Sequence, residues 1–228
     1  MRSRGLVIAV DGPSGAGKST AARALARALG YVFVDTGAMY RALALQALRR
    51  GVRLDSEEEV GRLAEGSRIE LIDAGCSLLL DGTPVSEAIR SPEVSEAASR
   101  ISAHPRVRRR MVALQREIGR EGGVVLDGRD IGTAVFPDAE VKFYVDAEPA
   151  CRAARRHAEQ LERGDASNLV EVEREIRERD RKDMTRADSP LTLAADAILV
   201  DTTRLSAHEV AERLLDVVNG RLAAVQRT

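Results

Sequence analysis

The feature that most constrains the fold of this chain is a glycine-rich loop between a short apolar run and a helix-forming segment. Residues 5–10 read Gly-Leu-Val-Ile-Ala-Val, which is typical of a strand buried on both faces. Residues 12–19 follow the pattern of Gly, four residues, Gly-Lys-Ser, and in this setting the pattern predicts a phosphate-binding loop. We expect a nucleoside triphosphate to bind at Gly12, Pro13, Ser14, Gly15, Ala16, Gly17, Lys18, Ser19 and Thr20.

Two side chains of this loop and one later aspartate predict a magnesium–triphosphate site. Lys18 is expected to contact the β- and γ-phosphates, and the Ser19 hydroxyl to bind Mg²⁺. An aspartate that ends a buried strand beside such a loop usually contacts the same ion, directly or through water. Asp127 follows the apolar run 124–126 and is the candidate for that role.

Apolar runs alternate with helix-forming segments along most of the chain, which predicts an α/β fold with a central parallel sheet. The last helix is expected to begin at Ser206, because Glu209 three residues later completes a capping box. The five expected strands cover residues 5–10, 31–34, 124–126, 141–145 and 198–200. The other expected helices cover residues 20–29, 37–50, 105–120, 148–163 and 169–183.

One stretch departs from this alternation. Residues 68–83 contain two short apolar runs around an Ala-Gly turn, which predicts an antiparallel hairpin, and Ser91-Pro92-Glu93 open a helix to about Ile101. We therefore expect a small inserted subdomain over residues 62–104, within a core formed by residues 1–61 and 105–228.

Composition and charge exclude several classes of protein. Lys and Arg number 35 and Asp and Glu 36, so the net charge of −1 argues against a nucleic-acid polymer or a membrane surface as partner. No apolar run is long enough for a membrane span or a signal peptide, and the two cysteines form no CxxC pair. We expect a cytoplasmic protein.

Two further polar segments are expected beside the phosphate-binding loop, at the carboxyl edge of the sheet where ligands bind. Residues 35–41 (Asp-Thr-Gly-Ala-Met-Tyr-Arg) could hold a second anion through Thr36 and Arg41, or could simply cap a helix. Residues 127–130 (Asp-Gly-Arg-Asp) place two carboxylates and Arg129 at the same edge, although Asp-Gly is also a favourable turn pair.

In this order and spacing, the motifs resemble those of bacterial cytidylate kinases, a family of nucleoside monophosphate kinases. The resemblance rests on the phosphate-binding loop and on residues 35–41, 127–133 and 179–186, and it extends from about residue 8 to residue 215. It includes the β-containing insert, a mark of that family. It implies a monomeric, three-layer P-loop kinase with a nucleoside monophosphate-binding insert and a helical lid at about 152–168. Such an enzyme transfers the γ-phosphate of MgATP to CMP or dCMP.

The resemblance also implies roles for individual residues. Lys18, Arg129 and Arg186 would act on the migrating phosphoryl group, and Arg155 and Arg156 of the lid would contact ATP. The implied contacts of the acceptor phosphate are Thr36, Arg41, Arg129 and Arg186. Arg179 and Asp183 would hold the ribose, with Tyr40 nearby, and Ser99, Arg108 and Asp130 would contact the cytosine.

Asp130 is the residue from which we expect a preference for CMP over UMP. A carboxylate can accept a hydrogen bond from the 4-amino group of cytosine, whereas uracil has a carbonyl there and would be repelled.

Two alternative acceptors stay open. One is another nucleoside monophosphate. The other is a small-molecule hydroxyl, as in shikimate kinase, and Asp130 would then be the base that accepts the hydroxyl proton. A nucleotide-dependent switch would typically carry an Asn-Lys-x-Asp motif, which this sequence lacks.

Overall fold

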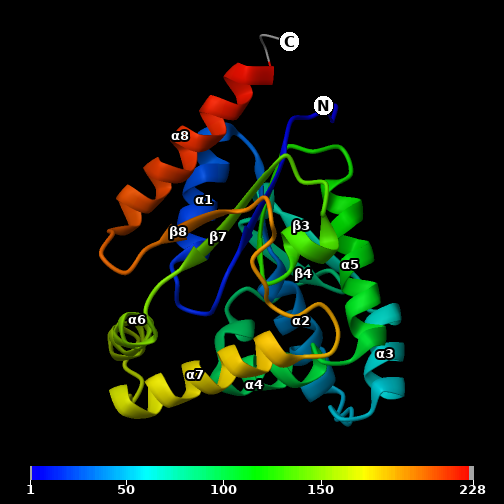
Figure 1. Ribbon diagram of the computed structural model, residues 1–228. Coiled ribbons are helices and arrows are strands. Elements are labelled where there is room, and N and C mark those ends of the chain that lie inside the picture. Colours follow the sequence, from blue (N-terminus) through cyan, green and yellow to red (C-terminus); the bar gives the residue numbers. More distant parts are fainter. Residues whose placement is uncertain (1, 226–228) are drawn as a thin grey trace.

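A computed structural model describes residues 2–225 and places five strands of that range in one parallel sheet (Figure 1). Each strand begins within a residue or two of its expected position, which confirms the predicted α/β fold. The order across the sheet is β2 (Val32–Asp35), β6 (Val124–Gly128), β1 (Val7–Asp11), β7 (Val141–Asp146) and β8 (Ile198–Asp201).

The central strand β1 is buried on both faces, as its continuous apolar sequence predicts. Ile8 and Val10 belong to the hydrophobic core that contains Leu25 of α1 (Lys18–Leu29) and Leu214 of α8 (Ala207–Val225). Val7 and Ala9 alternate with them and belong to the opposite core. That core is shared with α2 (Thr36–Arg49), α4 (Pro92–Ile101) and α5 (Pro105–Gly119). The strand therefore joins two cores, one on each face of the sheet.

All the expected helices occur, and six of them belong to the core around the central sheet. Figure 1 shows α1 and α8 together on one face of the sheet and α5 on the other. Their bounds are α1 (Lys18–Leu29), α2 (Thr36–Arg49), α5 (Pro105–Gly119), α6 (Pro149–Glu162), α7 (Leu169–Thr185) and α8 (Ala207–Val225).

The predicted capping box at the start of α8 is confirmed. The Ser206 hydroxyl accepts a hydrogen bond from the Glu209 backbone N–H at 3.3 Å, and the Glu209 carboxylate accepts one from the Ser206 N–H at 2.8 Å. Both N–H groups would otherwise lack a partner at the helix terminus.

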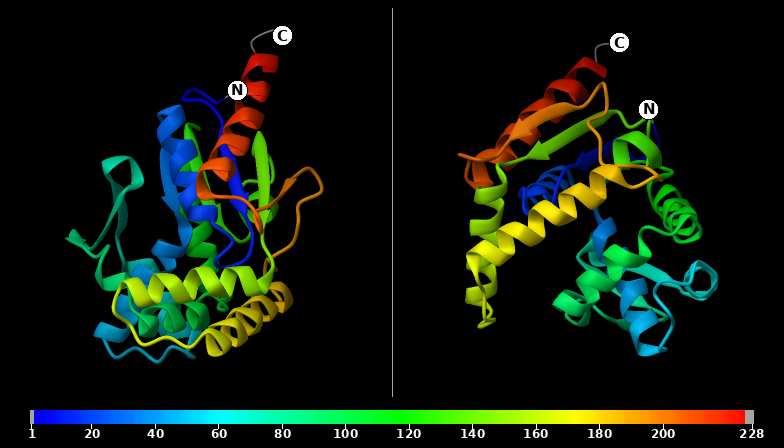
Figure 2. Two further views of the ribbon diagram at one scale, coloured as in Figure 1. Left: turned by 90° about the vertical axis from the view of Figure 1, so that its left-hand side faces the viewer. Right: turned by 60° about the horizontal axis from the view of Figure 1, so that its bottom comes forward.

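The predicted hairpin is present as β3 (Ile69–Ile72) and β4 (Ser77–Leu80), which are antiparallel. A third short strand, β5 (Thr83–Pro84), pairs with β4 and was not predicted. Figure 2 shows this small sheet projecting from the side of the molecule. The expected helix follows as α4 (Pro92–Ile101), and the Ser91 hydroxyl caps it by accepting from the Val94 N–H at 3.2 Å.

The sequence reasoning missed one helix, α3 (Glu57–Gly66). The signals were present, because the Ser56 side chain caps the helix and three glutamates occupy its first turn. The expected boundary of the insert at residue 62 falls inside this helix.

Leu78 and Leu80 of the insert share one continuous core with Val7 of the central sheet, so the insert has no separate hydrophobic core.

Helices α6 and α7 lie together at the end of the molecule opposite the C-terminus (Figure 2). They share a small apolar cluster of their own, formed by Ala153, Val172 and Ile176. The segment expected to be a lid, residues 152–168, comprises most of α6 and the loop that leads to α7.

No helix in the described part of the chain combines the length and apolar character that a membrane crossing requires.

Replacement of the capping serine tests the local stability of α8. We expect Ser206→Ala to lower the free energy of unfolding by about 1 kcal/mol, because the Glu209 N–H loses its acceptor and the hydroxyl no longer donates to the Glu209 carboxylate. Urea unfolding measures the change. Ser95→Ala is the matched control: this hydroxyl donates to the Ser91 carbonyl within a helix, and its loss should cost less than about 0.5 kcal/mol. Equal losses in the two variants would contradict the assignment.

Candidate active site

Three aspartates end neighbouring strands at the carboxyl edge of the sheet. Asp11 is the last residue of β1, Asp35 ends β2, and Asp127 lies near the end of β6. Asp35 and Asp127 are direct register partners, and Asp127 is paired with Val10 on its other side. Parallel pairing thus gathers residues from distant parts of the sequence at one edge, beside the loop that follows β1.

The phosphate-binding loop fits against β7 only because it begins with glycine. Gly12 has a φ of 143°, and a Cβ built there would lie 2.0 Å from the Val145 carbonyl oxygen. Any larger residue would collide with the backbone of β7. The loop therefore turns at the edge of the sheet and leads directly into α1, whose N-terminus faces the site.

Lys18 is buried within this loop. Its ammonium group donates a hydrogen bond to the Pro13 carbonyl at 2.6 Å and lies 4.0 Å from the Asp127 carboxylate. Burial, and after it the positive charge of Arg129, lower the pKa of Lys18 to about 8. An anion beside Lys18 would stabilise its charged form.

The residues predicted to bind Mg²⁺ are in contact. The Ser19 hydroxyl donates a hydrogen bond to the Asp127 carboxylate, whose pKa is raised by burial against the opposing charge of Lys18. A hydroxyl and a carboxylate oxygen are ligands of the kind that Mg²⁺ prefers. Within residues 2–225 no group of three or more His, Cys, Asp or Glu side chains is placed to hold a metal alone. This donor set fits an ion that takes its remaining ligands from phosphates and water.

A cavity of about 200 Å³ lies next to Lys18 and Ser19. It is lined by all ten residues predicted to surround the acceptor, so the structure brings them together, while their individual roles stay predictions. These residues are Thr36, Tyr40, Arg41, Ser99, Arg108, Arg129, Asp130, Arg179, Asp183 and Arg186. Asp35 and Ser102 also line the cavity and were not predicted; Ser102 lies one turn beyond Ser99, a spacing that could have indicated it.

Several of these residues pair with one another across the cavity. Arg129 donates to the Asp183 carboxylate at 2.8 Å. Asp130 forms an ion pair with Arg108 and lies 3.5 Å from Arg186. Burial raises the pKa of Asp130, and the charge of Arg108 opposes this effect. The Asp130 carboxylate thus has cationic partners in the cavity where it is predicted to contact cytosine.

At the start of α2, the helix-capping interpretation is correct for Asp35. Its carboxylate accepts from the Ala38 N–H at 2.7 Å and from the Arg41 guanidinium at 3.1 Å. The Thr36 hydroxyl donates its hydrogen to the Asp127 carbonyl at 2.6 Å, so a donor contact to a phosphate would require this bond to break. Arg41 still lines the cavity, beside the phosphate-binding loop.

Arg179 differs from its neighbours because its side chain has no hydrogen bond or ion pair with the residues that the structure describes, and its buried Nε has no acceptor. Burial, and then the charge of Arg129, lower its pKa to about 10. A partly buried cation without a counter-charge favours an anionic ligand. Arg179 also lies close enough to Lys18 to lower the pKa of that lysine. The predicted ribose contact of Arg179 stays a prediction.

A second cavity, of about 660 Å³, lies on the other side of the loop. Loop residues 15–20 line it together with Arg155, and it shares four lining residues with the first cavity: Gly15, Lys18, Ser19 and Arg41. Arg155 is held there by donating to the Thr202 carbonyl at 2.7 Å. Arg156 lines neither cavity, so the structure places only one of the two predicted lid arginines beside the loop.

Asp11 is a site residue that sequence reasoning missed. Its carboxylate accepts two hydrogen bonds, from the Ile131 N–H at 2.8 Å and the Gly132 N–H at 2.7 Å. Both N–H groups begin a π-helical turn, η3 (Ile131–Val135), directly after Asp130. Asp11 therefore ties the start of the phosphate-binding loop to the segment that carries Arg129 and Asp130. The signal in the sequence was a carboxylate at the end of an otherwise apolar strand.

The similarity to known proteins agrees with this geometry. The family model described as "Cytidylate kinase" matches residues 8–220. The chain belongs to the cytidylate kinase family. It is 50% identical to the cytidylate kinase of Desulfitobacterium hafniense (strain Y51), over 96% of this chain and 95% of that protein. It is 48% identical to the cytidylate kinase of Solibacter usitatus (strain Ellin6076), over 97% of this chain and 95% of that one.

The family resemblance expected from the motifs is thereby confirmed. Solved structures match more distantly. One is a shikimate kinase from Acinetobacter baumannii in complex with shikimate, which is 17% identical with a TM-score of 0.49, over 96% of this chain and 95% of that one.

The pH dependence of stability tests the environment of Asp11. Burial raises its pKa from 3.8 to about 7, although two backbone N–H groups oppose this shift. At pH values between these two pKa values, the Asp11 carboxyl is protonated in the folded protein and ionised in the unfolded chain. The free energy of unfolding therefore falls as pH rises through this range. Asp11→Asn removes this titration. Relative to the parent protein, the variant should therefore become more stable from pH 5 to pH 8, by at most ~1.4 kcal/mol per pH unit within the window.

Urea unfolding of both proteins at pH 5, 6.5 and 8 measures this difference. Asp165→Asn, in an exposed loop, is the control and should differ from the parent by the same amount at every pH. A pH-independent difference for Asp11→Asn as well would show that the Asp11 carboxyl does not titrate in this range.

Proposed function

We propose that this member of the cytidylate kinase family transfers the γ-phosphoryl group of ATP to CMP or dCMP, giving ADP and CDP or dCDP. The observation that carries the proposal is that Lys18 and Ser19 line both cavities. ATP in the larger cavity and a nucleoside monophosphate in the smaller one would place their phosphate ends next to each other. The names of the family and of its curated relatives support this choice of reaction.

The charge of the smaller cavity fits a phosphate monoester. Six cationic and four carboxylate side chains line it, which leaves a surplus of positive charge at the end near Lys18. Arg179, which has no partner among the described residues, is part of this surplus. The surplus would be balanced by a dianionic phosphate group, since a phosphate monoester loses its second proton at about pH 6.

This protonation state also determines what the protein has to do in catalysis. The acceptor oxygen is already anionic near neutral pH, so no strong general base is required. Lys18, Arg129 and Arg186 would hold two polyanions in line and reduce the repulsion between them, which is the main contribution of protein to phosphoryl transfer. We assign the acceptor phosphate to the arginines of this group together with Arg41.

Mg²⁺ bound to Ser19 and to Asp127, directly or through water, would neutralise negative charge on the ATP phosphates. The Ser19–Asp127 contact places both donors at the mouth of the loop. Arg155 would lie beside the nucleotide in the larger cavity. Movement of α6 and of the loop to α7 over ATP would exclude water and so limit hydrolysis.

The remaining assignments follow the family resemblance. We propose that residues 62–104 bind the monophosphate as an inserted subdomain, with Ser99 of α4 lining the acceptor cavity. The protein would act as a monomer in the cytoplasm, without a nucleic-acid polymer or a membrane as partner.

The proposed reaction is tested by ADP release from MgATP with CMP, dCMP, UMP, AMP and a panel of small alcohols that includes shikimate. We expect turnover with CMP and dCMP well above that with the other compounds. Arg129→Ala should lower kcat/KM for CMP by at least about 100-fold, because one charge-assisted contact to the phosphoryl group is lost. Preferential phosphorylation of an alcohol would overturn the proposal and would make Asp130 the base.

Discrimination between CMP and UMP tests the role of Asp130. We expect Asp130→Asn to lower kcat/KM for CMP roughly 10- to 100-fold, and to lower it little or not at all for UMP, because an amide can donate to the uracil carbonyl. Asp188→Asn is the matched control: Asp188 lies 3.7 Å from the same Arg108 but is 41% exposed. An unchanged CMP-to-UMP ratio in Asp130→Asn would refute the assignment of base recognition to this carboxylate.

A further inference from the structure

Arg152 on α6 is a buried arginine to which the proposed reaction gives no role. Only 3% of it is exposed, and each part of its guanidinium group has a different partner. Nε donates to the Ala147 carbonyl at 2.8 Å, at the turn between β7 and α6. One terminal nitrogen donates to the Ser14 carbonyl of the phosphate-binding loop at 3.1 Å, and the other lies 2.7 Å from the Asp180 carboxylate on α7.

The contact with the loop includes the backbone of α6. A Cβ built on Gly15 would lie 3.1 Å from Cβ of Arg152 and 3.3 Å from its carbonyl oxygen. The loop therefore lies directly against this residue, and a shift of Arg152 would displace Ser14 and Gly15. These two residues also line the acceptor cavity.

Asp180, the partner of Arg152 on α7, lies between two residues that line the acceptor cavity. Asp180 directly follows Arg179 and lies one turn before Asp183, and both of these line the acceptor cavity. Asp180 is 7% exposed, and its Oδ1 has no hydrogen-bond partner among the described residues. A buried carboxylate in this position depends on Arg152 for its counter-charge.

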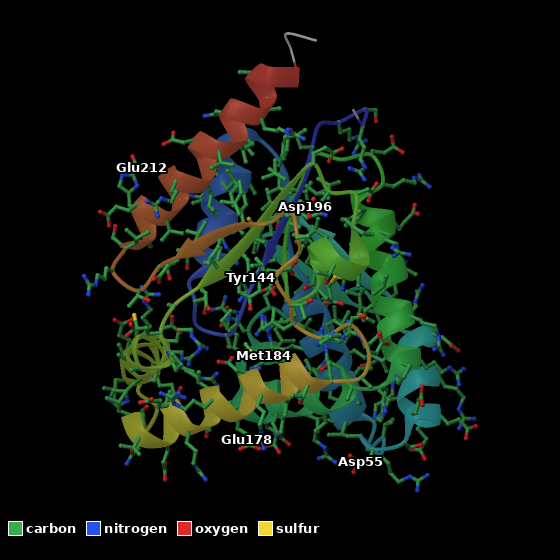
Figure 3. The ribbon with its side chains drawn as sticks, in the orientation of Figure 1. Asp55, Tyr144, Glu178, Met184, Asp196 and Glu212 are labelled. Carbon is green, nitrogen blue, oxygen red and sulfur yellow. The ribbon has the colours of Figure 1, made fainter. Side chains whose placement is uncertain are left out.

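The buried apolar side chains of α7, Val172 and Ile176, pack with Ala153 of α6 in a cluster separate from the two cores of the sheet. A cavity of about 720 Å³ separates α7 from the sheet, lined by Pro13 of the loop, Met184 of α7 and Leu199 of β8. Figure 3 shows Met184 and Tyr144 on the sheet side of α7 and Glu178 on its outer side. Polar bridges, from Arg152 to Asp180 and from Arg129 to Asp183, therefore determine where α7 lies relative to the loop.

We propose that Arg152 and Asp180 are positioning residues that couple the ATP loop to the helix carrying the acceptor residues. The inference rests on the proposed function, since it concerns how the same two substrates are aligned. A planar guanidinium with three partners fixes orientation as well as distance, which a single ammonium group cannot do. Occupation of the loop by ATP phosphates would then place Arg179 and Asp183 for the monophosphate, and binding of either substrate would strengthen binding of the other.

Two conservative variants test the coupling in the full-length protein. Arg152→Lys keeps the charge but loses the three-way contact, and Asp180→Asn keeps the shape but loses the charge. Titration calorimetry gives the Kd for CMP with and without a non-hydrolysable ATP analogue and Mg²⁺, and steady-state kinetics give kcat and KM. Lys182→Ala is the matched control, because its exposed ion pair with Glu178 lies on the outer side of α7.

In the parent protein and in Lys182→Ala, we expect the analogue to tighten CMP binding at least fivefold. In both test variants the Kd for CMP alone should stay within about threefold of the parent, while the tightening falls below twofold and kcat falls at least tenfold. Thermal unfolding shows whether each variant is folded at the assay temperature. The double variant Arg152→Met with Asp180→Leu removes the pair without leaving a buried charge, and it should show the same loss of coupling.

Retention of the parent's coupling in any folded variant of the pair would overturn the inference. A parent protein that binds both substrates and phosphorylates CMP without any coupling would overturn it as well, while leaving the proposed function intact. A parent protein that neither binds nor phosphorylates CMP would instead refute the proposed function.

Discussion

The structure depends on the way in which charge is balanced at the carboxyl edge of a buried parallel sheet. Strands β1, β2 and β6 each end in or near an aspartate, and these carboxylates lie among apolar cores. Burial raises the pKa of Asp11 and Asp127, so the edge tolerates this acidic charge only with cations or N–H donors beside it. Lys18, the loop and the π-helical turn provide these partners.

The arginines of the acceptor cavity divide into two groups with different consequences. Arg108 and Arg129 have carboxylate partners, and their positions are therefore set before any ligand binds. Arg179 has no partner among the described residues, and its charge is left for the ligand. Preorganised ion pairs beside an uncompensated cation are suited to a substrate that brings its own negative charge. This arrangement favours a phosphate acceptor over a neutral alcohol.

Two connections join the parts of the site that bind different substrates. Asp11 links the start of the phosphate-binding loop to the segment of Arg129 and Asp130. Arg152 links the middle of the same loop to α7. Asp11 and Arg152 are both buried, and their charged groups fix the orientation of the loop through directional hydrogen bonds, which apolar contacts do not provide. Alignment of two phosphates requires precision of this kind, because small errors in position are costly in phosphoryl transfer.

The sequence by itself determined the five strands of the central sheet, the phosphate-binding loop, the hairpin, the helix caps at Ser91 and Ser206, and the family. These features depend on local periodicity, turn chemistry and short motifs, and each of these patterns is contained within about ten consecutive residues. The ten acceptor residues were also identified before the structure, through the resemblance, and they do line one cavity.

Only the tertiary structure decided which of these charges are neutralised and which remain for a ligand. The partners of Asp11, Arg152 and Arg129 lie 120, 138 and 54 residues away along the chain. Sequence spacing shows which side chains share a face of one element, but not which side chain comes to lie opposite. That choice is made by the parallel pairing of distant strands and by the packing of α6 and α7 at the edge of the sheet.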